Sequence, residues 1–114
     1  MDVLGATAAE IARRRFGRPV ALVKRAAFLS STATSTVLEN NPRRVGWLIQ
    51  NIGANDAYLD FRANLDPTTA ILITRLGSTL AATVDEDGEM TGWALYGQGA
   101  TTGTTIVILE FIAR

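Results

Sequence analysis

Residues 43–51, Arg-Arg-Val-Gly-Trp-Leu-Ile-Gln-Asn, alternate apolar side chains with others in the way that a half-buried β-strand does. In such a strand Val45, Trp47 and Ile49 point toward a core and the intervening side chains point away from it. Residues 51–56, Asn-Ile-Gly-Ala-Asn-Asp, then supply the glycine and asparagine that tight turns use. The stretch therefore predicts a strand over 43–51 and a hairpin turn after it.

The chain from Pro19 onward repeats this pattern of short apolar runs, rich in β-branched residues and separated by Gly, Asn, Asp and Pro. The final run, over 104–112, is apolar on both faces, so it should be a central strand or one that a partner covers on one side. The predicted fold is all-β: a single antiparallel β-sandwich or jelly-roll-like domain of about eight strands over 26–114. The strands are expected near residues 20–24, 36–39, 43–51, 57–62, 70–74, 78–84, 92–96 and 104–112.

Residues 1–25 differ in composition and are predicted to form a basic N-terminal arm. Thr7-Ala8-Ala9-Glu10 fits a capping box, and Gly17 and Pro19 stop a helix, so a short helix is expected over about 8–16. The arm holds six basic and two acidic residues, whereas the remainder holds five basic and nine acidic ones. A basic arm on an acidic body favours docking to neighbouring copies or to another acidic surface.

The strongest local signal in the arm is a group of arginines around one aromatic residue. Their guanidinium groups could bind phosphates, so nucleic acid is one hypothesis. Without interleaved aromatics the group makes a weak nucleic-acid footprint, and we favour a protein interface in which the aromatic ring is a docking anchor. The predicted interface residues are Arg13, Arg14, Arg15, Phe16 and Arg18.

A second cluster of charge lies at residues 85–89, Asp-Glu-Asp-Gly-Glu. Its carboxylates resemble part of a calcium loop, but the twelve-residue spacing with a closing glutamate is missing. Because Asp87-Gly88 is also a hairpin turn pair, we interpret the segment as an exposed acidic turn and an electrostatic partner for the arm. Its acidic members are Asp85, Glu86, Asp87 and Glu89.

The chain contains no cysteine and no histidine. It therefore lacks thiolate ligands, the commonest metal ligand and the commonest general base, and we expect no enzyme activity, no cofactor and no metal. The glycine-rich residues 97–103 have no lysine and no helix pattern after them, so they predict a loop rather than a phosphate site. No apolar run is long enough for a membrane span and the N-terminus is not a secretory signal, so a cytoplasmic site of synthesis is expected.

Residues 41–53, Asn-Pro-Arg-Arg-Val-Gly-Trp-Leu-Ile-Gln-Asn-Ile-Gly, with Tyr58-Leu59 after them, resemble the small β-sandwich modules of tailed-bacteriophage virion proteins. Residues 76–78, 92–97 and 107–110 resemble the mid-domain turn and the last two strands of those modules. The resemblance covers roughly residues 40–112 and leaves the arm outside it. It implies a structural virion protein, such as a capsid decoration or cement protein, a head fibre or a tail attachment, and it carries no catalytic residues.

From this resemblance and the charge pattern we expect a decoration protein that binds the outer capsid surface as a homo-oligomer, with a trimer favoured. Its expected partners are the major capsid protein or other virion proteins, and its expected location is the virion. The alternative is a tail or head-fibre module that recognises a glycan or host surface. In that alternative Trp93, Tyr96 and Tyr58 would stack on the ligand, unless these rings simply fill the core.

Overall fold

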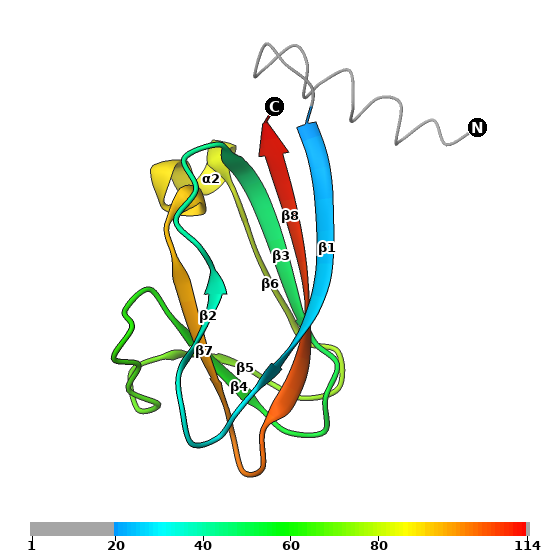
Figure 1. The fold of residues 1–114 in the computed structure, drawn as a ribbon, viewed down its shortest axis with the longest axis vertical. Helices are drawn as coiled ribbons and strands as arrows, with labels where there is room; N and C mark the ends of the chain where they lie inside the picture. The colour runs from blue at the N-terminus through cyan, green and yellow to red at the C-terminus, as the bar shows by residue number, and fades with distance from the viewer. Residues whose placement is uncertain (1–19, 114) are drawn as a thin grey trace, which may run out of the picture.

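Two four-stranded antiparallel sheets pack face to face in the computed structural model, which describes residues 20–113 (Figure 1). The sandwich predicted from the sequence is confirmed, with eight strands in the described part of the chain. The elements are β1 (Val20–Leu29), β2 (Ser35–Leu38), β3 (Arg44–Asn51), β4 (Ala57–Asp60), β5 (Ile71–Ile73), β6 (Thr79–Thr83), the short helix α2 (Val84–Asp87), the 3-10 helix η1 (Gly88–Gly92), β7 (Leu95–Gly99) and β8 (Thr104–Ala113).

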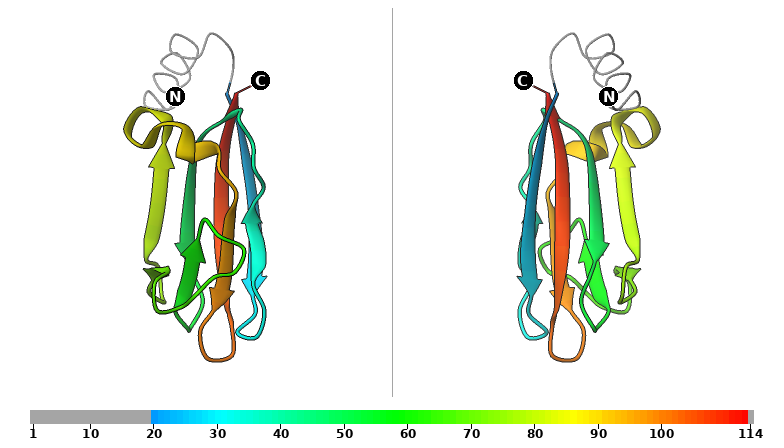
Figure 2. Two further views of the ribbon diagram at one scale, coloured as in Figure 1. Left: turned by 90° about the vertical axis from the view of Figure 1, so that its left-hand side faces the viewer. Right: turned by 90° about the vertical axis from the view of Figure 1, so that its right-hand side faces the viewer.

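The strand order defines a jelly roll. Sheet A has the order β1-β8-β3-β6, and sheet B has the order β2-β7-β4-β5. The first strand thus pairs with the last, the second with the seventh, the third with the sixth and the fourth with the fifth. In the two views of Figure 2 the strands of one sheet lie in front of those of the other. β8 lies between β1 and β3, which confirms the central position predicted for the last apolar run.

Inward side chains of both sheets meet in one apolar core. Trp47 is 4% exposed and Ile49 is fully buried, as the alternation predicted. The core residues are Leu29, Val37, Leu38, Trp47, Ile49, Ala57, Leu59, Ile73, Ala82, Leu95, Ile106 and Ile108. The sandwich is therefore closed by aliphatic side chains, with a single indole among them.

The alternation fails at the start of β3. The register between β3 and β8 shifts between Arg44 and Gly46, so an extra residue, Val45, stands at the irregularity. Val45 was predicted to face the core and is only half-buried, whereas Arg44, predicted to point away, is 3% exposed. The prediction for this pair was wrong because a bulge reverses the direction of every side chain that precedes it.

The turn after β3 is not a hairpin, since β3 belongs to sheet A and β4 to sheet B. The buried side chain of Asn51 shapes the crossing. Its amide nitrogen donates to the carbonyls of Asn55 at 2.8 Å and Ile73 at 3.1 Å, and its oxygen accepts from the amide of Gly53 and the hydroxyl of Thr104. This one side chain satisfies backbone groups that a hairpin ladder would otherwise have paired.

β1 is longer than predicted and runs to Leu29, because every residue from Val20 onward pairs with β8. Residues 20–25, which the sequence assigned to the arm, thus belong to sheet A. Residues 30–36, Ser-Ser-Thr-Ala-Thr-Ser-Thr, form a loop between the sheets and the start of the edge strand β2. Among residues 20–113 no helix has the length and apolar character needed to cross a bilayer.

Candidate functional site

The predicted arm interface, Arg13, Arg14, Arg15, Phe16 and Arg18, lies outside the described residues, as does the helix expected over 8–16. What the structure places is the point where this segment joins the sandwich. β1 begins, and β8 ends, at the end of the sandwich that carries α2 and η1 (Figure 1). We call this the α2 end.

The acidic residues lie on this α2 end. Asp85, Glu86 and Asp87 belong to α2 and Glu89 to η1, and Asp87 accepts a hydrogen bond from the amide of Thr83 at 2.9 Å. The segment is not the hairpin turn that Asp87-Gly88 predicted. β6 and β7 belong to different sheets, so their connection must cross the sandwich, which a two-residue turn cannot do.

The acidic segment is exposed at Asp85, Glu86 and Glu89. Within residues 20–113 no three carboxylate, histidine or cysteine side chains converge in a way that could hold a metal ion. The segment therefore presents negative charge to solvent at the same end at which the basic arm joins the chain.

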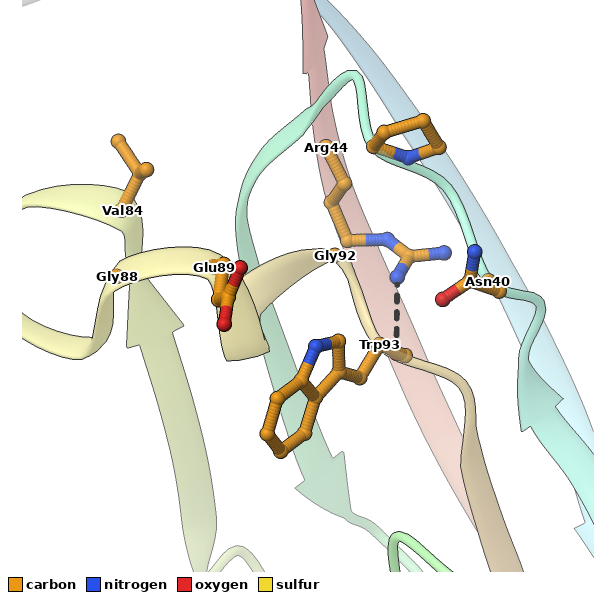
Figure 3. A pocket seen from close by; sticks show the side chains of 8 residues that line it. Asn40, Arg44, Val84, Gly88, Glu89, Gly92 and Trp93 are labelled. Atoms are coloured by element: carbon orange, nitrogen blue, oxygen red, sulfur yellow. Dashed lines mark hydrogen bonds between the residues drawn. The ribbon is translucent and has the colours of Figure 1, made fainter.

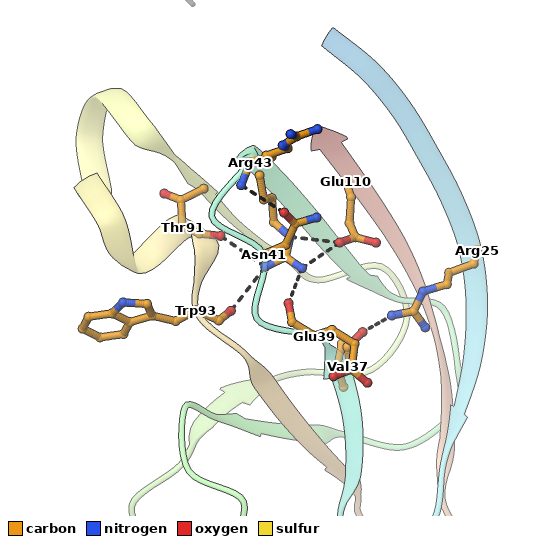
Figure 4. A network of polar contacts seen from close by, with 9 residues as sticks. Arg25, Val37, Glu39, Asn41, Arg43, Thr91, Trp93 and Glu110 are labelled. Carbon is orange, nitrogen blue, oxygen red and sulfur yellow. Dashed lines mark hydrogen bonds and ion pairs between the residues drawn. The ribbon is translucent and has the colours of Figure 1, made fainter. Parts of the chain in front are cut away.

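A buried arginine, Arg44, which the sequence did not single out, organises the α2 end. Figure 4 labels the residues whose groups it contacts, Glu110, Glu39, Thr91 and Trp93. Arg44 Nε donates to Glu110 Oε1 at 2.9 Å, and Arg44 Nη2 lies 2.9 Å from the same oxygen. The guanidinium also donates to three carbonyls, those of Glu39 at 2.5 Å, Trp93 at 3.3 Å and Thr91 at 3.4 Å. It thereby ties β3 and β8 to the loop after β2 and to the end of η1.

The edge of this network continues to β1, where the Arg25 guanidinium donates to the carbonyl of Val37. All of these contacts join a strand to another strand or to a connecting loop, so they hold the strands of the two sheets in place. An arginine that is nearly fully buried and shared among a carboxylate and three carbonyls is held rigidly, because any movement leaves buried acceptors unpaired. The network acts as a clamp on the α2 end.

A shallow pocket of about 280 Å³ opens beside the clamp (Figure 3). Arg44 lines it, but its donors are already taken by the clamp. The remaining polar side chains on its wall are those of Asn40 and Glu89, and the indole of Trp93, 45% exposed, stands at its side. Phe61 contacts that indole edge-on, with ring centroids 5.8 Å apart. The pocket thus offers a ring, an amide and a carboxylate.

Two more aromatic rings lie on the outer face of sheet B, the face turned away from the core. Tyr58 on β4 and Tyr96 on β7 are both half-buried. The register places Tyr58 opposite Gln98 and Tyr96 opposite Asp60, so the two rings are diagonal neighbours on adjacent strands. The hypothesis that Trp93 fills the core is wrong, and the two tyrosines also lie outside the core cluster.

The outer face of sheet A has a different composition. By the alternation of the strands, Leu22 and Phe28 of β1 and Phe111 of β8 point away from the core, and they are 58%, 62% and 38% exposed. Leu48 of β3 and Leu109 of β8 stand opposite each other on the same face and are half-buried. This face of sheet A therefore presents exposed apolar side chains to its surroundings on both β1 and β8.

Comparison with known proteins identifies no family. No family model matches the chain, and no curated protein matches it. Among solved structures the chain is similar to one from Bacillus endospore appendages, which are described as a novel family of disulfide-linked pili. The match has 10% sequence identity and a TM-score of 0.49, and it covers 83% of this chain and 88% of that one. A likeness at this level carries no conclusion about what the present chain does.

Proposed function

We propose that this chain is a non-catalytic structural module of a tailed-phage virion, a decoration protein that acts by binding other protein chains. The observation that carries the proposal is the outer face of sheet A, where Leu22, Phe28 and Phe111 stand exposed on a regular sheet. A sheet face that serves only as a surface normally carries polar side chains at these outward positions. Contiguous exposed apolar patches are typical of protein–protein contact sites.

The α2 end supports the proposal from a second direction. The acidic segment follows β6, three strand spacings or about 14 Å across sheet A from β1, where the arm joins. Arg18 and Arg13 precede Val20 by two and seven residues, which an extended chain spans in about 7 to 25 Å. The arm is thus long enough to reach acidic side chains on its own α2 end or on a neighbouring copy.

The Arg44 clamp is consistent with a structural role. Its buried charges are used to hold the α2 end in one arrangement, at which the arm joins the sandwich and the acidic segment is displayed. Such a platform keeps the docking groups in fixed positions. We therefore propose a function in assembly, in which the chain binds other copies of itself and the major capsid protein.

The capsid as the place of action rests on the sequence resemblance of residues 40–112 to phage β-sandwich modules. Co-sedimentation of the purified chain with tailed-phage capsids that lack their decoration protein tests it. We expect the intact chain in the pellet, in an amount that falls as the salt concentration rises. A variant with Arg13, Arg14 and Arg15 replaced by glutamine should pellet less at low salt and depend less on the salt concentration. A chain that stays in the supernatant at every salt concentration contradicts the proposal.

A second candidate function is recognition of a glycan, and one observation favours it. The exposed indole of Trp93 stands beside Glu89 and Asn40 at the pocket, an arrangement in which a ring stacks on a sugar and polar groups bind its hydroxyls. Glycan-array binding by the intact chain tests this. Binding that is lost in Trp93→Ala but kept in Leu72→Ala, another exposed apolar residue, supports it. An array without binding removes it.

A further inference from the structure

The register of sheet A arranges its outward side chains in rows that cross the strands. One row holds Leu22, Phe111, Gly46 and Thr83, and the next holds Lys24, Leu109, Leu48 and Ala81. A third row holds Ala26, Val107, Gln50 and Thr79, and Phe28 stands opposite Thr105 beyond it. The right-hand view of Figure 2 faces this side of the molecule, with the strands of sheet A side by side.

The rows are almost free of charge. Among the outward positions of these four strands, as far as the structure describes them, Lys24 is the one ionisable residue. Lys24 belongs to the edge strand β1, where its ammonium group can extend past the rim of the face into water while its methylenes stay on the apolar surface. The face thus has a neutral, apolar centre and a charge only at one border, as interface cores have.

The glycine in the first row adds to the smoothness of the face. A Cβ atom at Gly46 would stand 3.4 Å from Cδ2 of Phe111, so the phenyl ring lies against the backbone of β3. Phe111 is accordingly less exposed than Leu22 and Phe28 at the edge strand. The central strands therefore present a low surface of leucine, valine and phenylalanine groups with one amide, that of Gln50, which donates to the Gly77 carbonyl. A second flat surface can pack on it.

We propose that in solution this face is covered by the same face of a second copy of the chain. The inference deepens the proposed function by naming the partner, and it differs from the trimer expected from the sequence because one flat face packs against one other. Two sheets packed in this way lie about 10 Å apart, as they do in a sandwich core. The pairing removes the apolar rows of both copies from water at once.

The size of the face selects this occupant. With about 4.8 Å between strands and about 3.3 Å per residue, the strands of sheet A span a projected area of roughly 500 Å². Two such faces, whose side chains add to the projected area, reach the range of about 1,000 Å² or more that stable interfaces bury. A helix over residues 8–16 would be about 13 Å long and 10 Å wide and would cover only about a quarter of the face.

Sedimentation equilibrium of the full chain over a range of concentrations tests the pairing. We expect the molecular mass of a dimer. The dissociation constant of the dimer should rise at least about 10-fold in Leu22→Glu and in Phe28→Glu, because each substitution removes a large apolar group from the interface. Leu72→Glu is the matched control, because Leu72 is 52% exposed on the edge strand β5 of the other sheet. All three residues are exposed in the single chain, so circular dichroism should show an unchanged fold.

Four outcomes overturn the inference. The chain could be a monomer at all concentrations or a trimer. It could also form a dimer that Leu22→Glu and Phe28→Glu leave intact, or a dimer that Leu72→Glu weakens as much as those two variants do. A molecular mass of one chain, combined with binding of an apolar dye that appears only when Ile11 of the helix expected over 8–16 is replaced by glutamate, would identify the arm as the cover instead. The experiment contains no capsid. A chain that pairs but fails to pellet with capsids contradicts the proposed function alone, and one that pellets as a monomer contradicts this inference alone.

Discussion

Replacement of Trp47 by alanine is the sharpest test of the side-chain directions in β3. Trp47 is 4% exposed and belongs to the core cluster, so the substitution leaves a large cavity between the two sheets. Truncation of a core tryptophan costs about 3–5 kcal/mol. The indole nitrogen of Trp47 is buried with no hydrogen-bond partner among the described residues, so alanine also removes a group that gains nothing from burial. We therefore expect the lower end, about 3 kcal/mol.

The matched variant is Leu48→Ala, one residue further along the same strand. Leu48 points to the outer face of sheet A and is half-buried in the single chain. Half of the transfer free energy of the lost methine and two methyl groups gives about 1 kcal/mol. The two substitutions thus share their place in β3 and differ in the face from which they remove a side chain.

Urea unfolding at a protein concentration low enough for single chains measures both free energies of unfolding. A loss of about 3 kcal/mol is a large part of the roughly 5–15 kcal/mol by which a small domain is stable. The corresponding melting temperatures should fall by about 4–8 °C for each kcal/mol. A greater loss for Leu48→Ala than for Trp47→Ala would show that the faces of β3 are assigned the wrong way round.

Further substitutions probe the clamp, the crossing loop and the arm. Arg44→Met should lower the free energy of unfolding by about 3–5 kcal/mol and more than Glu110→Gln, because it strands a carboxylate and three carbonyls together; an equal or smaller loss in urea unfolding would contradict the clamp. Gly53→Ala should melt far below Gly46→Ala, since a Cβ atom would lie 1.9 Å from the Thr104 hydroxyl oxygen at the first position and no closer than 3.4 Å to any atom at the second; similar melting temperatures would refute the packing of that loop. Deletion of residues 1–18 should leave a folded body but impair assembly with capsids, and a truncated chain that pellets as well as the intact one would refute the role of the arm.

The strands could be predicted because inward and outward side chains alternate along each strand of a sandwich, which gives the sequence an apolar period of two. Trp47, Ile49 and the run at 104–113 show this directly, since their burial follows the alternation or the uninterrupted apolar character of each segment. Pairing partners could not be predicted, because the nested order that joins β1 to β8 depends on contacts between the ends of the chain. The expected hairpin after Asn51 failed for the same reason.

The Arg44 clamp could not be predicted, because a single bulge in β3 determines the direction of the Arg44 side chain. If β3 paired regularly with β8 and had no bulge at Val45, Arg44 would point outward, as Gly46 and Leu48 do. A signal was present in the sequence: Glu110 is the one charged residue in the apolar run of β8, and a carboxylate among apolar side chains needs a cationic partner. Which arginine would meet it depends on the register with β3 and not on either sequence alone.

The same central strands, β8 and β3, supply both the core and the outer face of sheet A, so folding and pairing should be coupled. Ile108 and Ile49 pack inward, while Leu109 and Leu48, their neighbours in sequence, point to the face that a second copy would cover. If pairing stabilises the folded chain, mass action requires the melting temperature to rise with protein concentration. Leu22→Glu should remove this dependence and leave a melting temperature equal to that of the dilute intact chain, because Leu22 is 58% exposed and adds little to the core. If the melting temperature of the intact chain does not change with concentration, folding is not coupled to pairing. The apolar rows would then have no role in stability.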